Sequence, residues 1–287
     1  MRTIENVSLE RSIAVLKLSS EMLLNDNEIG ISETAVGECA DRVAEVNEQF
    51  HPLVVLGSAV GAGKAFLLEA GDDPEGVDSQ VLASYGTPDV SIAVRNALIR
   101  RGMKSGQVLA NHNQMYAGST LMQGMLNGII LEQNVYHINE NDQENRYGLK
   151  MLEQEHEDER RTRREKPVGI DNDPLASRLT IALIEELKAQ GLAEDLACHL
   201  VMFTKVGGVM MGGAVQAEIS ACDRERVYEE CIGSRPGGSG GMKVKVKACY
   251  EAHDAGATSV HIASPDQNWL GVIEGRGETG KVTKVVQ

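Results

Sequence analysis

Short apolar runs alternate along the chain with longer segments in which apolar residues recur at helical spacing. The apolar runs predict buried strands, at 12–18, 52–56, 106–110, 135–138, 199–204 and 259–262. The helically spaced segments predict helices, one opening at Ser32-Glu33 and others near 78–101, 116–128, 174–190 and 242–255. This alternation favours an α/β fold with a mainly parallel central sheet. Because no linker or internal repeat interrupts it, we expect a single domain over residues 1–287.

The charge balance narrows the class of function. The chain of 287 residues has 42 acidic and 28 basic side chains, a formal charge of −14, whereas binding to nucleic acid or to an anionic membrane requires a basic face. No apolar run approaches the roughly 20 residues that span a bilayer, and residues 1–6 show no signal-peptide pattern. Five scattered cysteines without CxxC spacing indicate reduced thiols. We therefore expect a cytoplasmic protein with neither a nucleic-acid nor a membrane partner.

Residues 146–168 form a charged insert in the middle of the chain. Lys150 to Lys166 holds six acids and six bases, with hardly an apolar residue after Leu152. One interpretation is a solvated helix. The other is a lid or a subunit contact, because both ends of the insert adjoin candidate ligand-binding residues.

Two glycine motifs resemble nucleotide-binding loops but lack the required context. Gly57 to Ala65 is similar to a P-loop, yet its first glycine is one position too early and Ala65 stands where a Ser or Thr hydroxyl binds magnesium. Gly275 to Gly280 matches GxGxxG, but too little chain follows it for a helix and a second strand. The histidines are not paired at metal-ligand spacings, so we expect no metal held by the protein alone.

Polar residues lie where an open α/β sheet usually binds ligands, beyond the carboxyl ends of its strands. Gly57-Ser58 follows one expected strand, Asn139 to Asp142 follows another, and Asp171 to Asp173 opens a helix. Turns and helix caps are the ordinary use of each such cluster. Together, in this order, they predict a binding site at one edge of the sheet.

Two lysines accompany these clusters. Lys17 lies near the end of the first strand, and Lys245 follows the glycine cluster 237–241, whose backbone amides can approach phosphate closely. Taken alone, such a lysine is usually solvated and such a cluster is more often a flexible loop. Two lysines with an aspartate between them fit a phosphoryl-transfer site, because that chemistry needs charge stabilisation and positioning more than covalent catalysis.

Five motifs, in order, resemble the amino-acid kinase family, and within it the glutamate 5-kinases most closely. The matches are VVKLGT at Val15 to Ser20, VTSGAxAAG at Val55 to Gly63, VPVINEND at Val135 to Asp142, GDNDxLSA at Gly169 to Ser177, and TGGMxTK at Ser239 to Lys245, where each motif is written as the family has it. The resemblance runs from Val15 to about Val286. It implies a three-layer αβα sandwich around a mainly parallel sheet, as in carbamate kinase, without the C-terminal PUA domain of many bacterial glutamate 5-kinases.

The resemblance also implies a reaction. The γ-phosphoryl group of ATP would pass to the side-chain carboxylate of glutamate or a close analogue, as in the first step of proline synthesis. Lys17 and Lys245 would flank the transferring group and neutralise its charge, while Asp173 would hold both lysines in place. Mg²⁺ would arrive bridging the ATP phosphates, so no protein metal cage is implied. A homo-oligomer is implied as well.

The binding residues follow from the same resemblance. Asp142 and Asn172 would bind the amino-acid substrate, and the turn at Gly57 and Ser58 would offer backbone amides to its carboxylate. The nucleotide pocket would be lined by Lys17, Thr204, Lys205, Ser239, Gly240, Gly241, Met242 and Lys245.

Departures from the family pattern leave the acceptor open. Ser19 stands where the family has glycine, Gly57-Ser58 replaces Ser-Gly and moves the substrate-binding hydroxyl by one residue, and Thr204-Lys205 replaces Thr-Asp. One alternative is a family enzyme that phosphorylates a different small carboxylate or amino-acid-like acceptor in a specialised pathway. A second is a non-catalytic kinase fold that serves as a sensor or assembly subunit. Retention of both lysines and Asp173 argues against the second.

Overall fold

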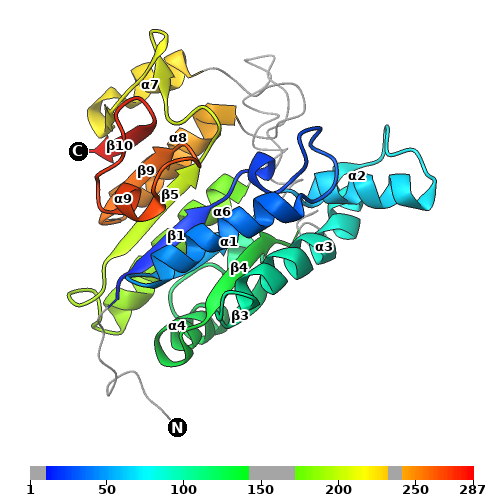
Figure 1. Cartoon of the computed structure of the whole chain (residues 1–287). Coiled ribbons are helices and arrows are strands. Elements are labelled where there is room, and N and C mark those ends of the chain that lie inside the picture. Colours follow the sequence, from blue (N-terminus) through cyan, green and yellow to red (C-terminus); the bar gives the residue numbers. More distant parts are fainter. Residues whose placement is uncertain (1–10, 142–171, 232–240) are drawn as a thin grey trace.

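A central sheet organises the computed structural model, which describes residues 11–141, 172–231 and 241–287 (Figure 1). In these ranges eight strands form the sheet in the order β3-β4-β2-β1-β5-β9-β10-β8. Neighbouring strands are parallel except for β9 and β10, which are antiparallel. The strands are β1 (Ile13–Lys17), β2 (His51–Val55), β3 (Ser105–Ala110), β4 (Val135–Glu140), β5 (Cys198–Phe203), β8 (Glu218–Ser220), β9 (Ser259–Ala263) and β10 (Val282–Val286).

Helices cover both faces of the sheet (Figure 1). One apolar core joins the sheet to α1 (Glu33–Asn47), α3 (Ser79–Ile99) and α9 (Trp269–Ile273). A second core joins the opposite face to α4 (Thr120–Glu132), α6 (Asn172–Ala189) and α8 (Gly241–Asp254). The expected three-layer αβα sandwich with a mainly parallel sheet is therefore confirmed.

Local sequence explains where the central elements begin and end. All five residues of β1 are buried, as expected for a parallel strand covered on both faces. Ser32 caps α1 by accepting a hydrogen bond from the amide of Ala35, and acidic Glu33 follows in the first turn. The remaining described elements are the helices α2 (Ala59–Ala70) and α7 (Arg224–Glu230), the short hairpin of β6 (Met210–Met211) and β7 (Ala214–Val215), and the 3₁₀ turns η2 (Ser20–Met22), η3 (His112–Gln114) and η4 (Ala221–Asp223).

The glycine-rich segment after β2 is largely helical. Helix α2 begins at Ala59, so Gly61 and Gly63 lie inside a helix. A Cβ at Gly63 would lie 1.8 Å from the carbonyl oxygen of Leu82, and one at Gly86 would lie 2.0 Å from the carbonyl oxygen of Ala59. These glycines allow the backbones of α2 and α3 to touch, which explains the glycine cluster without a phosphate.

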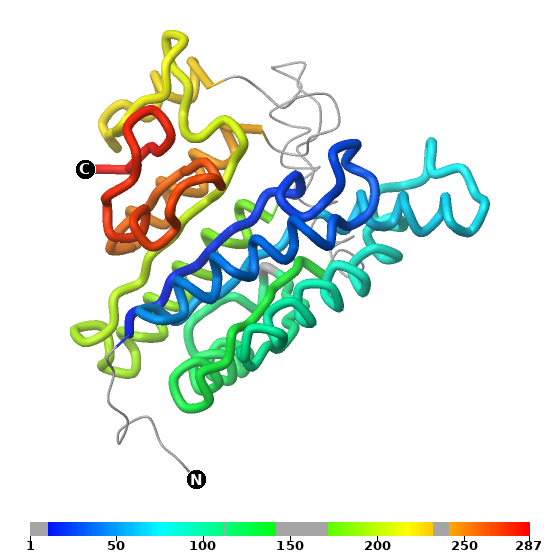
Figure 2. Tube along the Cα trace, in the orientation of Figure 1, coloured from blue at the N-terminus to red at the C-terminus, as the bar shows by residue number. Residues whose placement is uncertain are grey.

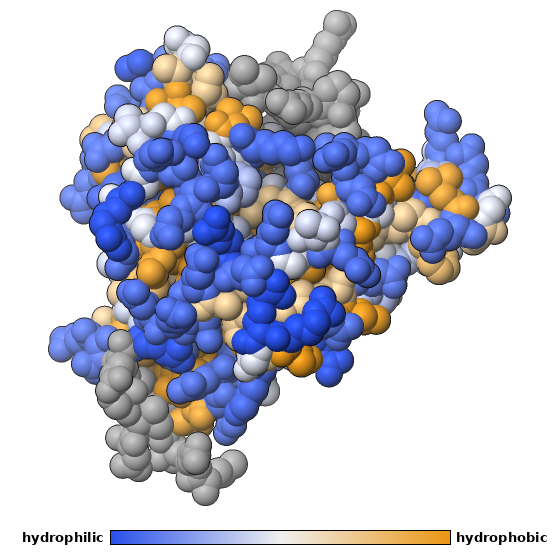
Figure 3. Space-filling view, viewed as in Figure 1, coloured by the Kyte–Doolittle hydropathy of each residue, from blue (hydrophilic) through white to orange (hydrophobic). Residues whose placement is uncertain are grey.

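The α2–α3 pair projects from the rest of the molecule (Figure 2). Its outer part carries exposed apolar side chains, and the rings of Phe66 and Tyr85 stack there with centroids 5.0 Å apart. Figure 3 shows apolar side chains on this projection beside a largely hydrophilic face.

The end of the chain contributes elements that the sequence pattern did not predict. Residues 275–280, the GxGxxG match, form a connection that leads into β10 rather than into a helix. β10 pairs with β9 and with β8, and so extends the sheet beyond the last expected strand. No helix in the described ranges is long and apolar enough to cross a membrane. The charged insert 146–168 lies outside the described residues.

Candidate active site

The topology of the sheet places the site at the end of β1. This strand lies between β2 and β5. The connection from β1 to β2 runs through α1 on one face, whereas α8, which leads into β9, packs on the other. The order of the strands therefore changes direction at β1. In open α/β sheets, the carboxyl ends of the strands at such a point form the usual ligand-binding crevice.

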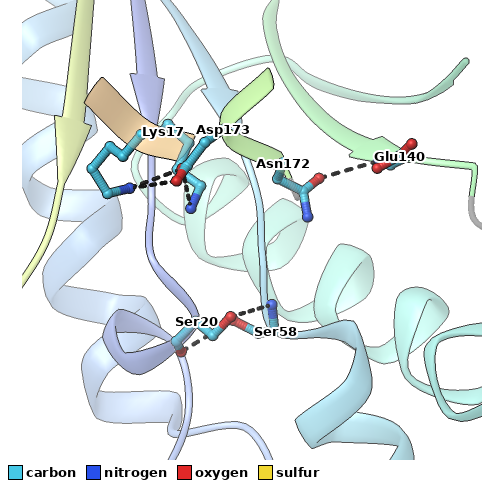
Figure 4. A network of polar contacts seen from close by, with 7 residues as sticks. Lys17, Ser20, Ser58, Glu140, Asn172 and Asp173 are labelled. Carbon is cyan, nitrogen blue, oxygen red and sulfur yellow. Dashed lines mark hydrogen bonds and ion pairs between the residues drawn. The ribbon is translucent and has the colours of Figure 1, made fainter. Parts of the chain in front are cut away.

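Three charged side chains meet at this point. Lys17 ends β1, Asp173 lies in the first turn of α6, and Lys245 lies in α8. Asp173 Oδ1 is 2.6 Å from Lys17 Nζ, and both Asp173 oxygens are 2.8 Å from Lys245 Nζ. All three are buried, with exposed fractions of 5%, 2% and 7% for Lys17, Asp173 and Lys245. Figure 4 shows Lys17 and Asp173 pointing toward each other.

The lysines keep Asp173 ionised. Burial opposes ionisation of this carboxyl group, but the charges of Lys17 and Lys245 and their hydrogen bonds outweigh it and lower the pKa of Asp173 to about 2. One carboxylate and two ammonium groups carry a net charge of +1. This buried positive centre suits the oxygens of a phosphoryl group.

A second contact joins the start of α6 to the end of β4. Asn172 Oδ1 accepts a hydrogen bond of 3.4 Å from the amide of Glu140 (Figure 4). Glu140 itself is buried, with 2% of its surface exposed. Asn172 and Asp173 are adjacent, so this bond fixes the position of the β4 end relative to the charged centre.

The turn at Gly57 and Ser58 is engaged within the protein. The Ser58 amide donates to Ser20 Oγ at 3.1 Å, and the Ser58 hydroxyl donates to the Ser20 carbonyl oxygen at 3.1 Å (Figure 4). Both Ser58 donors, which the sequence had led us to assign to the substrate, are thus used by Ser20. Ser58 also has a φ of +86°, unusual for a residue other than glycine. The two bonds hold it in this conformation.

Several of the residues that we expected to line the nucleotide pocket lie after the end of β5 and at the start of α8. Thr204 follows this strand, and its amide donates to the carbonyl oxygen of Ala263 at the end of β9. Lys205 Nζ lies 3.2 Å from Glu21 Oε2, so an ion pair joins this side to the loop after β1. Gly241 begins α8 with a φ of +63°, where glycine is favoured. Met242, in the same turn, packs against the apolar core.

The structure thus brings together Lys17, Asp173 and Lys245, as expected, and it places Asn172, Gly57 and Ser58 at the same edge of the sheet. Asp142, Ser239 and Gly240 lie outside the described residues.

Sequence analysis gave no individual role to Ser20, Glu21, Asn139 or Glu140, although it placed Asn139 and Glu140 in a predicted ligand-binding cluster. Ser20 contacts the Gly57-Ser58 turn, Glu21 pairs with Lys205, and Glu140 bonds Asn172. The amide nitrogen of Asn139 donates to the carbonyl oxygen of Leu56 at 3.4 Å. Their closeness to expected strand ends was the available signal: Ser20 and Glu21 follow Lys17 within one loop, and Asn139 and Glu140 end β4.

Solved structures share this fold at low sequence identity. Carbamate kinase from Giardia lamblia bound to AMP-PNP has a TM-score of 0.62 and 12% identity, over 97% of this chain and 100% of that chain. UMP kinase from Ureaplasma parvum has a TM-score of 0.55 and 11% identity, over 96% of this chain and 100% of that one. N-acetylglutamate synthase from Neisseria gonorrhoeae, complexed with coenzyme A and N-acetyl-glutamate, has a TM-score of 0.58 and 13% identity, over 99% of this chain and 61% of that one. No family model and no curated protein matches the sequence. The chain therefore has the α/β fold of carbamate kinase and UMP kinase.

Proposed function

We propose that this protein is a cytoplasmic kinase of the amino-acid kinase family that uses ATP to phosphorylate the side-chain carboxylate of glutamate or a close analogue. The observation that carries the proposal is the contact of Asp173 with both Lys17 and Lys245 at the carboxyl end of β1. The shared fold of two solved kinases supports it. The product would be an acyl phosphate, as in the first step of proline synthesis.

The charged centre fits the phosphates of ATP. Lys17 and Lys245 offer ammonium donors, and the single carboxylate of Asp173 contacts both of them. Thr204, Lys205, Gly241 and Met242 would line the nucleotide pocket, together with Ser239 and Gly240. In the described ranges no group of three His, Cys, Asp or Glu side chains is arranged to hold a metal ion. Mg²⁺ carried on the ATP phosphates would supply further charge neutralisation.

The two lysines would act in the transfer step itself. An acceptor carboxylate oxygen attacks the γ-phosphorus while the bond from phosphorus to the bridging oxygen breaks, which leaves ADP and an acyl phosphate. Lys17 and Lys245 stabilise the negative charge on the transferring oxygens. Asp173 keeps both ammonium groups in position, so that little reorganisation is needed when the charge develops. Asn172 and Asp142 would hold the amino group and polar atoms of the acceptor.

A related function has support from two other contacts. The Ser20–Ser58 bonds occupy donors that an amino-acid carboxylate would otherwise use, and Lys205, which pairs with Glu21, stands where the family has an aspartate at the nucleotide. Both fit an enzyme of the same family that phosphorylates a different small carboxylate or amino-acid-like acceptor. A non-catalytic sensor or assembly subunit would have no chemical need for two buried lysines on one carboxylate.

The deciding experiment measures ADP release from Mg-ATP against a panel of carboxylates and amino acids, with hydroxylamine present to trap acyl phosphate as hydroxamate. Turnover and hydroxamate with glutamate would support glutamate as the acceptor. Turnover with another member of the panel would assign the altered contacts to specificity. Bound ATP without turnover on any member would contradict the proposed kinase activity and favour the sensor.

We also propose that the protein forms a homo-oligomer through α3. Tyr85, Ile92 and Ile99 recur every seven residues on its outer face, with exposed fractions of 40%, 55% and 46%. Asp89 and Arg95 are exposed and lie three residues before and after Ile92. In an antiparallel pair centred on Ile92, Asp89 of each copy would face Arg95 of the other. This charge complementarity favours a second copy of the chain as the partner.

A further inference from the structure

The loop after β1 presents a serine hydroxyl whose oxygen is held in place. Ser20 Oγ accepts the amide hydrogen of Ser58, while the Ser58 hydroxyl donates back to the Ser20 carbonyl oxygen. Ser20 is exposed, whereas Ser58 is 5% exposed. The pair therefore fixes the hydroxyl of a solvent-exposed residue three residues beyond Lys17, at the carboxyl ends of β1 and β2.

The polar hydrogens of Ser20 and Ser58 differ in whether they are already used in hydrogen bonds within the protein. Ser58 has two polar hydrogens, on its amide and its hydroxyl, and both go to Ser20. The Ser20 hydroxyl uses its oxygen as an acceptor and keeps its own hydrogen. No residue in the described part of the chain accepts that hydrogen. Of these two serines, only Ser20 can donate from its side chain to a bound molecule.

The arrangement has a cost, which makes a purely incidental role a poor explanation. Ser58 is held at a φ of +86°, where a residue with a side chain is strained. Strain of this kind persists where the surrounding structure imposes it, and it gathers at ligand-binding sites. Here the strained backbone points the Ser58 amide at Ser20 Oγ.

The Ser20 hydroxyl occupies the space that a side chain at position 57 would fill. A Cβ at Gly57 would lie 2.8 Å from Ser20 Oγ, and its next neighbours, at 3.4 and 3.6 Å, would be ordinary contacts. A side chain at position 57 and the Ser20 hydroxyl therefore compete for the same place. The backbone of Gly57 does not have a positive φ, so only the hydroxyl stands in the way.

We propose that Ser20 is a specificity-determining residue whose hydroxyl donates a hydrogen bond to the acceptor. This inference rests on the proposed kinase function. Lys17 and Lys245 serve the transferring phosphoryl group, so the Ser20 hydroxyl contacts a different part of the acceptor molecule. That part carries a hydrogen-bond-accepting oxygen, and a second carboxylate is the group that such a donor binds best. The substrate class is a dicarboxylate, with or without an amino group.

The first test replaces Ser20 by alanine. With L-glutamate as the probe and Mg-ATP at saturation, Ser20→Ala should raise the KM for the acceptor about tenfold or more, the effect of a lost bond to a charged group. The KM for ATP should stay close to wild type, whereas the thermal midpoint should fall, because the buried Ser58 amide loses its acceptor. Ser84→Ala is the matched control, because the Ser84 hydroxyl bonds only the carbonyl oxygen of Val81 in its own helix.

The second test moves the hydroxyl and so separates binding from a structural role. In Ser20→Gly/Gly57→Ser the clash is removed and a hydroxyl returns to the same space from the turn after β2. In Ser20→Gly/Gly57→Ala the backbone change is the same but the oxygen is missing. We expect the first double variant to recover acceptor KM, and the second to keep the defect of Ser20→Ala.

The outcomes distinguish the inference from the function on which it rests. An active wild type with an unchanged acceptor KM in Ser20→Ala overturns the role of Ser20 and leaves the kinase proposal standing. Equal acceptor KM values for the two double variants also overturn it. A wild type that turns over neither glutamate nor any other dicarboxylate, but does turn over monocarboxylates, contradicts the substrate class alone. Inactivity with every carboxylate overturns both proposals.

Discussion

Lys245 approaches Asp173 symmetrically: its Nζ lies 2.8 Å from each carboxylate oxygen. Lys17 adds a second cation on Oδ1 at 2.6 Å. A carboxylate shared in this way fixes two ammonium groups from separate parts of the fold at one point. The relationship gives the proposed mechanism its most direct tests.

Replacing Lys245 should slow the phosphoryl transfer. We expect Lys245→Ala to lower kcat at least tenfold, about 1.4 kcal/mol of barrier, because one of two charges that stabilise the transferring group is removed. Lys247→Ala is the control, since Lys247 is an exposed lysine of the same helix. Hydroxamate formation at saturating substrates measures both variants. A smaller loss for Lys245→Ala than tenfold would show that the assigned role is wrong.

Replacing Asp173 should lower the free energy of unfolding by an amount that depends on pH. Its pKa of about 2 lies below the ordinary carboxyl value of about 4, so its contribution is fully present above about pH 4 and is lost as the pH falls through 2. Asp173→Asn removes the negative charge that both buried ammonium groups contact, which costs about 3–5 kcal/mol at pH 7. Urea unfolding at pH 7 and pH 3 should show a smaller difference from wild type at the lower pH. A pH-independent difference would contradict the ion pairs.

Replacing His261 should make the protein less sensitive to acid. Burial, with the nearby charges of Lys284 and His199, lowers the pKa of His261 to about 4, and neither ring nitrogen has a partner in the described ranges. Between about pH 6.5 and 4 the unfolded chain therefore binds a proton that the folded chain does not, and stability falls as the pH falls. His261→Leu should flatten the slope of the unfolding free energy near pH 5 by about 1.4 kcal/mol per pH unit.

His137 provides the contrast for this measurement. Burial, with the charge of Arg95, lowers its pKa to about 4 as well, but its two ring nitrogens bond the hydroxyls of Ser91 and Ser105. His137→Leu should flatten the same slope yet cost stability at pH 7, because two hydroxyls lose their partner. Identical stabilities of the two variants at pH 7 would argue against this distinction.

The contact between α2 and α3 should respond to a single methyl group. Gly63→Ala would place Cβ 1.8 Å from the carbonyl oxygen of Leu82, so we expect a loss of about 1–3 kcal/mol or more as the helices are forced apart. Gly124 is the matched control, a helical glycine with open space around its Cβ position. Gly124→Ala should stabilise the fold by about 0.5–1 kcal/mol. Thermal unfolding measures both, and shifts of the same sign would refute the packing argument.

The outer face of α3 should determine the oligomeric state. Ile92→Glu places a charge at the centre of the proposed two-fold contact and should give a monomer by light scattering. Asp89→Arg and Arg95→Asp should each weaken the assembly, and the double variant should restore it, because the charges then match again. Leu68→Glu, at an exposed apolar position of α2, is the control. A wild-type monomer would reject the proposal.

Apolar patterning was enough to predict the layers of the fold, but it did not reveal what the glycines do. The buried runs of β1 and β5 and the Ser32 cap have local causes, so they can be recognised in the sequence. Helix α2 escaped recognition because Gly61 and Gly63 are needed for contact with another segment, and that contact is set by the tertiary fold. The two-residue strands β6 and β7 are too short to show a period.

Some contacts of the candidate site could also be predicted from the sequence, and others could not. Lys17, Asp173 and Lys245 each lie within a recognisable motif. The topology of the sheet explains why the three are close together. The Ser20–Ser58 bonds could not be predicted, because they depend on the positive φ of Ser58 and on the missing side chain at Gly57. The Lys205–Glu21 pair likewise depends on how two loops meet.

The central place of β1 also bears on how the chain folds. This strand is made first, yet its neighbour on one side is β5, with Ile13 opposite Cys198 and Lys17 opposite Met202. One edge of a strand that is apolar from Ile13 to Leu16 therefore stays unpaired until residue 203 has been synthesised, and such an edge invites pairing with other chains. Lys17 sits at the end of that strand. Lys17, which is proposed to act in phosphoryl transfer, thus also ends the apolar run with a charge during the time before β5 has been synthesised.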